Sequence, residues 1–204
     1  MRELPKSEVR AVRQGPPRPS PRSKVQSPIS LHARPVVAAS KCLLGQPCRY
    51  DGKIISAPWI EELAVVVRFV PVCPELSIGL PVPRDPVRLV ETVNGIRLIQ
   101  TLTGNDLTRK MRSFCRTFLA EHKPDGFILK ARSPSCAVSD ALVYDELGQE
   151  TGAELPGIFA DEALTRSLFT PMEDEEGLRD PGRMAGFVTR LLVPSPAPKK
   201  RRSR

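Results

Sequence analysis

Three cysteines in three separate segments are the residues of this chain best able to do chemistry. Cys42 stands in SKCLLGQPCRYDG, Cys73 in FVPVCPEL and Cys136 in LKARSPSC, each where a predicted strand gives way to a tight turn. Four thiolates would complete a structural metal site, whereas three leave one position free for water or a substrate. The pattern therefore predicts a metal centre at which a reaction takes place.

The elements that must position these cysteines follow an α/β order. Short apolar runs at 36–43, 64–72 and 126–131 are typical of buried strands, and a predicted cysteine turn ends or follows each run. The segment VRLVETVNGIRLIQ alternates on both sides of Asn94-Gly95, which predicts a β-hairpin. Parallel strands place their carboxyl ends at one edge of a sheet, so we expect the three cysteines to lie there together.

Helices are predicted between these strands. Apolar residues at helical spacing favour a helix over 106–121, and shorter helices are expected at 59–63, 161–168 and 182–192. We interpret the glycine-containing stretch before 161 as a loop. The order predicts a mostly parallel sheet in a single α/β domain.

The charge of the chain is concentrated at its two ends. Residues 1–35 carry eight Lys or Arg and two acids, and residues 194–204 carry five Lys or Arg and no acid. Residues 36–193 carry 18 Lys or Arg and 21 acids. The first segment is also rich in proline, and neither end has apolar periodicity. We therefore expect disordered basic tails at 1–35 and 194–204, open to weak nucleic-acid contact, around an acidic domain at 36–193.

Several classes of protein do not fit this composition. No stretch is long and apolar enough for a membrane span, and no hydrophobic segment follows the first charges, so we expect a cytoplasmic protein without membrane contact. Five cysteines at irregular spacing argue against a disulfide framework and favour thiols or metal ligation.

Three blocks of the sequence resemble the thiouracil desulfidase family, known first as a small uncharacterised bacterial domain. They are KCLLGQPCRYDGK, FVPVCPELSIGLPVPRDP and LKARSPSC, in the family's order and spacing between about Val37 and Phe169. The chain departs from the family at Ala137, where glycine is usual, and at Tyr144-Asp145-Glu146, where a YDG turn is usual.

The resemblance implies a Rossmann-like α/β domain, of three layers, that holds a [4Fe-4S] cluster through Cys42, Cys73 and Cys136. It also implies that the open iron takes the sulfur of a small thiolated nucleobase or nucleotide such as 2- or 4-thiouracil, leaving the oxo base. By motif position, Glu75 would be the assisting acid or base and Ser133 a substrate-positioning residue.

The remaining candidates have structural alternatives. Cys115 lies on the apolar face of the 106–121 helix and is expected to pack in the core. Cys48 is a candidate fourth ligand or a resting thiol near Cys42. Arg49 and its neighbours are expected to brace the first cysteine loop, while neither histidine, His32 or His122, resembles a metal ligand.

Two competing functions remain open at this point. The three cysteines could hold zinc or an air-labile cluster in a metal-binding or redox-sensing module whose basic tails contact nucleic acid. A thiol enzyme without metal is a third possibility, although the sequence offers no obvious histidine partner. Neither the oligomeric state nor the final sulfur acceptor follows from the sequence.

Overall fold

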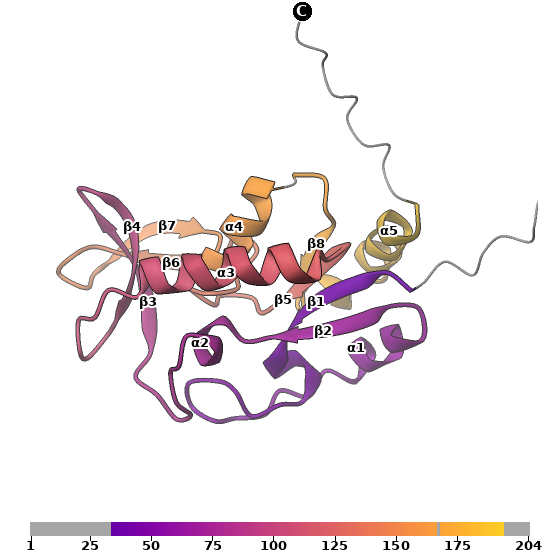
Figure 1. The fold of residues 1–204 in the computed structure, drawn as a ribbon, viewed down its shortest axis with the longest axis horizontal. Helices are drawn as coiled ribbons and strands as arrows, with labels where there is room; N and C mark the ends of the chain where they lie inside the picture. The colour runs from indigo at the N-terminus through magenta and orange to yellow at the C-terminus, as the bar shows by residue number, and fades with distance from the viewer. Residues whose placement is uncertain (1–33, 167, 194–204) are drawn as a thin grey trace, which may run out of the picture. The chain divides into compact units, whose positions relative to one another are not determined.

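The computed structural model describes residues 34–166 and 168–193, which form an α/β unit built on two four-stranded sheets (Figure 1). The predicted tails, 1–35 and 194–204, lie almost wholly outside the described residues. Within the described part, no helix is long and apolar enough to cross a membrane.

The first sheet has the strand order β2-β1-β5-β8, and every pair in it is parallel. Its strands are β1 (Val36–Ser40), β2 (Arg68–Val72), β5 (Gly126–Leu129) and β8 (Met172–Asp174). All four residues of β5 are buried, as expected for a central parallel strand covered on both faces. β1 pairs with β2 and with β5, so the chain returns to both sides of its first strand.

The second sheet has the order β4-β3-β6-β7 and is mixed. Its strands are β3 (Val87–Thr92), β4 (Gly95–Gln100), β6 (Ala141–Tyr144) and β7 (Glu150–Leu155). The predicted hairpin is β3–β4, and Gly95 takes a φ of +91° at its turn, which a glycine adopts without strain. The sequence did not reveal that this hairpin belongs to a separate sheet.

The helices are α1 (Pro58–Glu62), α2 (Pro74–Ser77), α3 (Thr108–His122), α4 (Ile158–Arg166) and α5 (Pro181–Leu192). Single 3₁₀ turns, η1 to η3, span Lys41–Leu44, Leu63–Val65 and Gly177–Arg179. Figure 1 shows α3 running in front of the sheets, from the hairpin side toward β1 and β5.

Alternating residues of the first sheet bury two different faces. Ala38 of β1 and Phe127 of β5 belong to the core with α3 and α4, whereas Val37 and Ile128 belong to a second core with α1 and α5. A sheet covered on both faces by helices is the three-layer arrangement predicted from the sequence, and the α/β fold class is confirmed.

The predicted strands at 36–43 and 126–131 end earlier in the structure, and the one at 64–72 begins later. The apolar run at 64–72 forms a strand only from Arg68, because η2 occupies its beginning, with Val65 79% exposed to solvent. β-Branched residues favour strands only where a neighbouring strand pairs with them, and β1 pairs with β2 from Arg68 onward.

Candidate functional site

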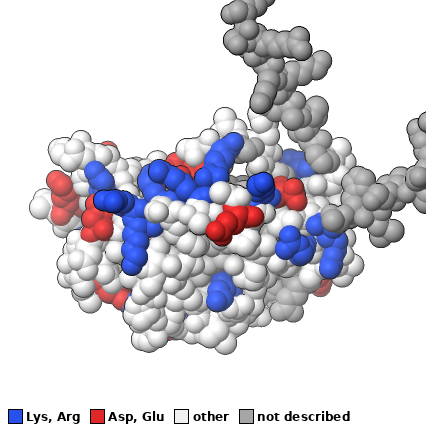
Figure 2. Space-filling view, viewed as in Figure 1, with Lys and Arg blue, Asp and Glu red and all other residues white. Residues whose placement is uncertain are grey.

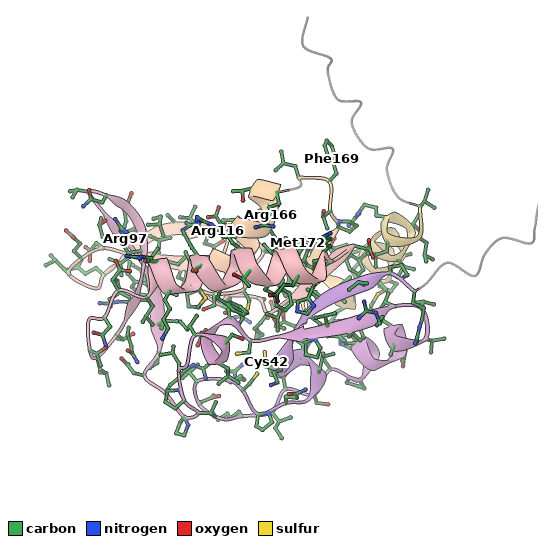
Figure 3. The ribbon with its side chains drawn as sticks, viewed as in Figure 1. Cys42, Arg97, Arg116, Arg166, Phe169 and Met172 are labelled. Carbon is green, nitrogen blue, oxygen red and sulfur yellow. The ribbon has the colours of Figure 1, made fainter. Side chains whose placement is uncertain are left out.

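The three predicted cysteines meet at the carboxyl edge of the first sheet. Cys42 lies in η1 directly after β1, Cys73 directly follows β2, and Cys136 lies in the loop after β5. Because these three strands are neighbours and parallel, their following turns come together, and all three cysteines line one cavity of about 420 Å³. Figure 3 shows Cys42 beside α2, with further sulfur atoms near it.

A fourth cysteine, Cys48, lines the same cavity and is buried. A side-chain hydrogen bond with Cys42 raises the pKa of Cys48 to about 11. A hydrogen bond with Cys48 in turn raises the pKa of Cys73, and burial raises that of Cys136. Each of these shifts favours the thiol over the thiolate.

The Cys136 loop is shaped by its own serine and by the start of α4. The Ser133 hydroxyl accepts backbone hydrogen bonds from Ser135 at 3.3 Å and from Cys136 at 3.2 Å, which is a serine turn. The helix N–H groups of Ile158 and Phe159 bond to carbonyls of the same loop.

Gly157 brings that helix start against the Cys136 loop. A Cβ on Gly157 would lie 2.6 Å from the backbone nitrogen of Cys136, far closer than real side chains approach. The position therefore requires glycine because of contact rather than because of its φ angle.

Glu75, in the first turn of α2, lines the cavity with a side chain that is only 12% exposed. Arg84 Nε donates to one carboxylate oxygen at 2.7 Å, and Ser135 Oγ donates to the other at 2.8 Å. Both oxygens are thus held, and each retains a lone pair for a further contact.

Apart from Glu75, the charged side chains that line the cavity are cations. Among the lining residues that the structure describes, Glu75 is the only acid, and the cations are Lys41, Arg49, Arg84, Lys130 and Arg132. Lys130 and Arg132 also form ion pairs with Glu175 and Glu176, behind the lining. A cavity of this charge favours an anionic occupant.

Arg49, Tyr50 and Asp51 follow Cys48, and the structure shows the simpler alternative to a bracing role, which is a pair between Arg49 and Asp51. Arg49 Nε bonds to Asp51 at 3.1 Å, and its guanidinium lies 5.8 Å from the centre of the Tyr50 ring. Arg49 and Tyr50 both line the cavity, whereas Asp51 does not.

The other sequence candidates lie elsewhere. Cys115 is buried in the core between α3 and its neighbours, as predicted. His122 ends α3 and packs against Phe118 with the two rings tilted and their centres 4.4 Å apart, whereas His32 lies outside the described residues.

Sequence reasoning missed two residues of the site, Arg84 and Ser135. Both stand in the blocks that carry the family resemblance, in PVPRDP and SPSC. Ser135 is fully buried and Arg84 is 3% exposed at its side chain, so their partners could only be read from the structure.

A site for one metal ion requires its protein ligands at about 2.0–2.3 Å from a common point. In 34–166 and 168–193, no group of three or more His, Cys, Asp or Glu side chains is arranged around a single ion in this way.

Comparisons with known proteins agree with the motifs at this cavity. The family model described as 2-thiouracil desulfurase matches residues 37–175, which include the whole lining. The uncharacterised protein YbbK of Bacillus subtilis (strain 168) is 29% identical over 153 residues, which is 71% of this chain and 99% of YbbK.

A solved structure is similar as well. The [4Fe-4S]-dependent thiouracil desulfidase TudS matches with a TM-score of 0.55 and 27% identity, over 76% of this chain and 99% of TudS. The family model covers well over half of the sequence and contains all of the cysteine blocks. The chain therefore belongs to the 2-thiouracil desulfurase family.

Proposed function

We propose that this protein removes sulfur from thiolated pyrimidine bases such as 2- or 4-thiouracil, with a [4Fe-4S] cluster held by Cys42, Cys73 and Cys136. The observation that carries the proposal is that three cysteines from three separate loops line a single cavity. Family membership and the similarity to TudS support the same cofactor and the same class of substrate.

The residues present fit such a cluster. Thiolates are the ligands that iron–sulfur clusters require, and the cationic lining complements the negative charge of a thiolate-bound cluster. Three cysteine ligands leave one iron without a protein ligand, and when bound this iron supplies a soft acceptor for the thiocarbonyl sulfur.

The reaction is a hydrolysis: the thiobase and one water become the oxo base and hydrogen sulfide. We assign Glu75 as the group that takes a proton from the attacking water, since its carboxylate lines the cavity and both of its oxygens are held in place. Tyr50 is the aromatic residue among the described lining residues, and we assign it to contact the pyrimidine ring.

Ser133 remains assigned to substrate positioning. Its hydroxyl already accepts two backbone N–H groups, so its own proton is the group available to a substrate. The same bonds give the Cys136 loop its shape, so the Ser133 side chain would both shape this loop and position the substrate.

An anaerobic assay tests the proposal. Protein reconstituted with iron and sulfide is incubated with 2- and 4-thiouracil, and uracil and released sulfide are measured together. We expect equal amounts of the two products, and Glu75→Gln should lower the rate by about 10²–10⁴-fold, the usual contribution of a positioned acid or base. Absence of uracil from fully loaded wild-type protein would refute the proposed function.

A further inference from the structure

We propose that Arg84 is a positioning residue, one that aims the Glu75 carboxylate and ties together the three loops that carry the cysteines. The catalytic part of the inference, that Arg84 aims Glu75, rests on the proposed function, in which Glu75 accepts a proton. The structural part, that Arg84 ties the cysteine loops together, concerns only contacts within this chain.

Arg84 uses each nitrogen of its guanidinium on a different partner. Nε donates to Glu75 at 2.7 Å, Nη2 to the carbonyl of Cys48 at 3.0 Å, and Nη1 to the carbonyl of Pro81 at 3.2 Å. The side chain is 3% exposed, so water does not replace a lost partner. Lysine cannot reproduce this arrangement, since it lacks the planar fork of donors.

These bonds connect all three cysteine segments. The Cys48 carbonyl belongs to the loop that follows Cys42, Glu75 lies two residues after Cys73, and Ser135, which bonds to Glu75, precedes Cys136. Arg84 and Glu75 therefore form the centre of a hydrogen-bonded clamp, which we define as Arg84, Glu75, Ser135 and the Cys48 carbonyl.

No cysteine side chain takes part in this clamp. Cys73 Sγ also donates to the Cys48 carbonyl, at 3.8 Å, a longer contact than the 3.0 Å bond from Arg84. The bond from Arg84 therefore holds the carbonyl without the thiol.

Arg84 also supplies the counter-charge that a nearly buried carboxylate needs. The Arg84 guanidinium donates to one Glu75 oxygen and to the Cys48 carbonyl, so one cation lies between the carboxylate and the first cysteine loop.

A double-mutant cycle tests whether Arg84 acts through Glu75. The variants are Arg84→Gln, Glu75→Gln and the double variant, with Arg84→Lys to keep the charge. Arg97→Gln is the control. Arg97 lies on β4, away from the cavity (Figure 3), and its substitution removes the same charge as Arg84→Gln. Each is loaded with iron and sulfide, and the rate of thiouracil conversion is expressed per bound cluster.

We expect Arg84→Gln to lower kcat by about as much as Glu75→Gln, and the double variant to lose no more than about threefold beyond either single one. KM should change less than kcat, since all three guanidinium nitrogens of Arg84 already bond to protein groups. Arg84→Lys should not restore the rate, and Arg97→Gln should match wild type. Additive losses in the double variant, or wild-type kcat in Arg84→Gln, would overturn the catalytic part.

Iron release to a chelator provides a readout that does not depend on activity. Arg84→Gln should lose iron at least about tenfold faster than wild type, and Arg97→Gln at the wild-type rate, because only the former frees the cysteine loops. Equal release rates would overturn the clamp. If wild-type protein holds iron but converts no thiouracil, the proposed function fails while this comparison still decides the clamp. If Arg84→Gln does not fold, Arg84→Lys takes its place in both measurements.

Discussion

Two regions of this molecule contain the same ingredients, a buried cysteine beside an arginine–glutamate pair. At the carboxyl edge of the first sheet, Cys73 and Cys136 lie near Arg84 and Glu75. Between α3 and α4, Cys115 lies near Glu162, which bonds to Arg112 at 2.8 Å and to Arg116 at 3.0 Å. Burial raises the pKa of Cys115 to about 12, so both regions also contain weakly acidic thiols.

The difference lies in what surrounds these groups. The α3–α4 pair fixes one helix to another, and Cys115 packs among the apolar side chains of the core. The other pair lies at the edge of a parallel sheet, where four cysteines line one space. Figure 2 shows basic side chains gathered on the face where α3 and the hairpin lie, which gives a charged surface there without converging thiols. The candidate site thus differs from the α3–α4 region because several cysteines converge there on one cavity.

The largest effect is expected from the cysteines at the cavity. Cys42→Ser, Cys73→Ser and Cys136→Ser should each lose most of the bound iron and all thiouracil conversion, since a hydroxyl is a poor ligand for an iron–sulfur cluster. Iron content and absorbance near roughly 400 nm after anaerobic reconstitution measure the loss. Cys115→Ser is the control and should keep both; a colourless Cys115→Ser beside a brown Cys136→Ser would reverse the assignment.

Cys115→Ser should instead lower the free energy of unfolding. The hydroxyl would be buried in the core between α3 and its neighbours, at a cost of about 1–3 kcal/mol. Urea unfolding of the iron-free protein measures this cost separately from the cluster. A variant as stable as wild type would show that Cys115 is not closely packed.

A smaller and pH-dependent effect is expected from Glu162→Gln. Burial alone would raise the pKa of Glu162, but its hydrogen bonds with Arg116 and Arg112 lower it overall, below the ordinary value of 4.5. Its contribution to stability is therefore complete above about pH 4.5 and is lost as the pH falls through the lower folded value.

The variant should be less stable than wild type at pH 7 by about 1 kcal/mol, a modest figure because Arg112 and Arg116 are partly exposed. The difference should shrink at pH 3, and thiouracil conversion at pH 7 should stay at the wild-type rate. A stability difference that grows toward acid pH would contradict the ion pair.

The smallest effect on chemistry is expected from removing the two predicted tails. A chain of residues 36–193 should convert free thiouracil as fast as the full chain, since the motifs and the cavity lie inside it. With thiolated tRNA as substrate, the same deletion should weaken binding and flatten its salt dependence, because 13 cationic side chains are lost. An equal loss on both substrates would contradict a separate role for the tails.

The three cysteines of the candidate site could be predicted from the sequence for one physical reason. Cys42, Cys73 and Cys136 follow apolar runs, and the parallel arrangement of those runs forces their carboxyl ends together. Cys115 was placed in the core from helical spacing alone, and the structure agrees.

What the sequence did not predict depends on pairing between distant segments. β7 is exposed along nearly its whole length and has no apolar alternation, so its stretch was interpreted as a loop. β8 has three residues, too few for a periodic signal. Arg84 was missed because its partners lie in α2, in its own loop and in the distant loop of Cys48, and a single arginine in a proline-rich stretch carries no pattern.

The strand order β2-β1-β5 sets when the cavity can first exist. During synthesis from the N-terminus, Cys42, Cys48 and Cys73 emerge well before β5. Until β5 emerges, β1 has no partner strand on the side where β5 pairs with it. Only when residues 126–136 have left the ribosome can the last cysteine loop close over the others. Insertion of the proposed [4Fe-4S] cluster therefore has to follow the emergence of residues 126–136.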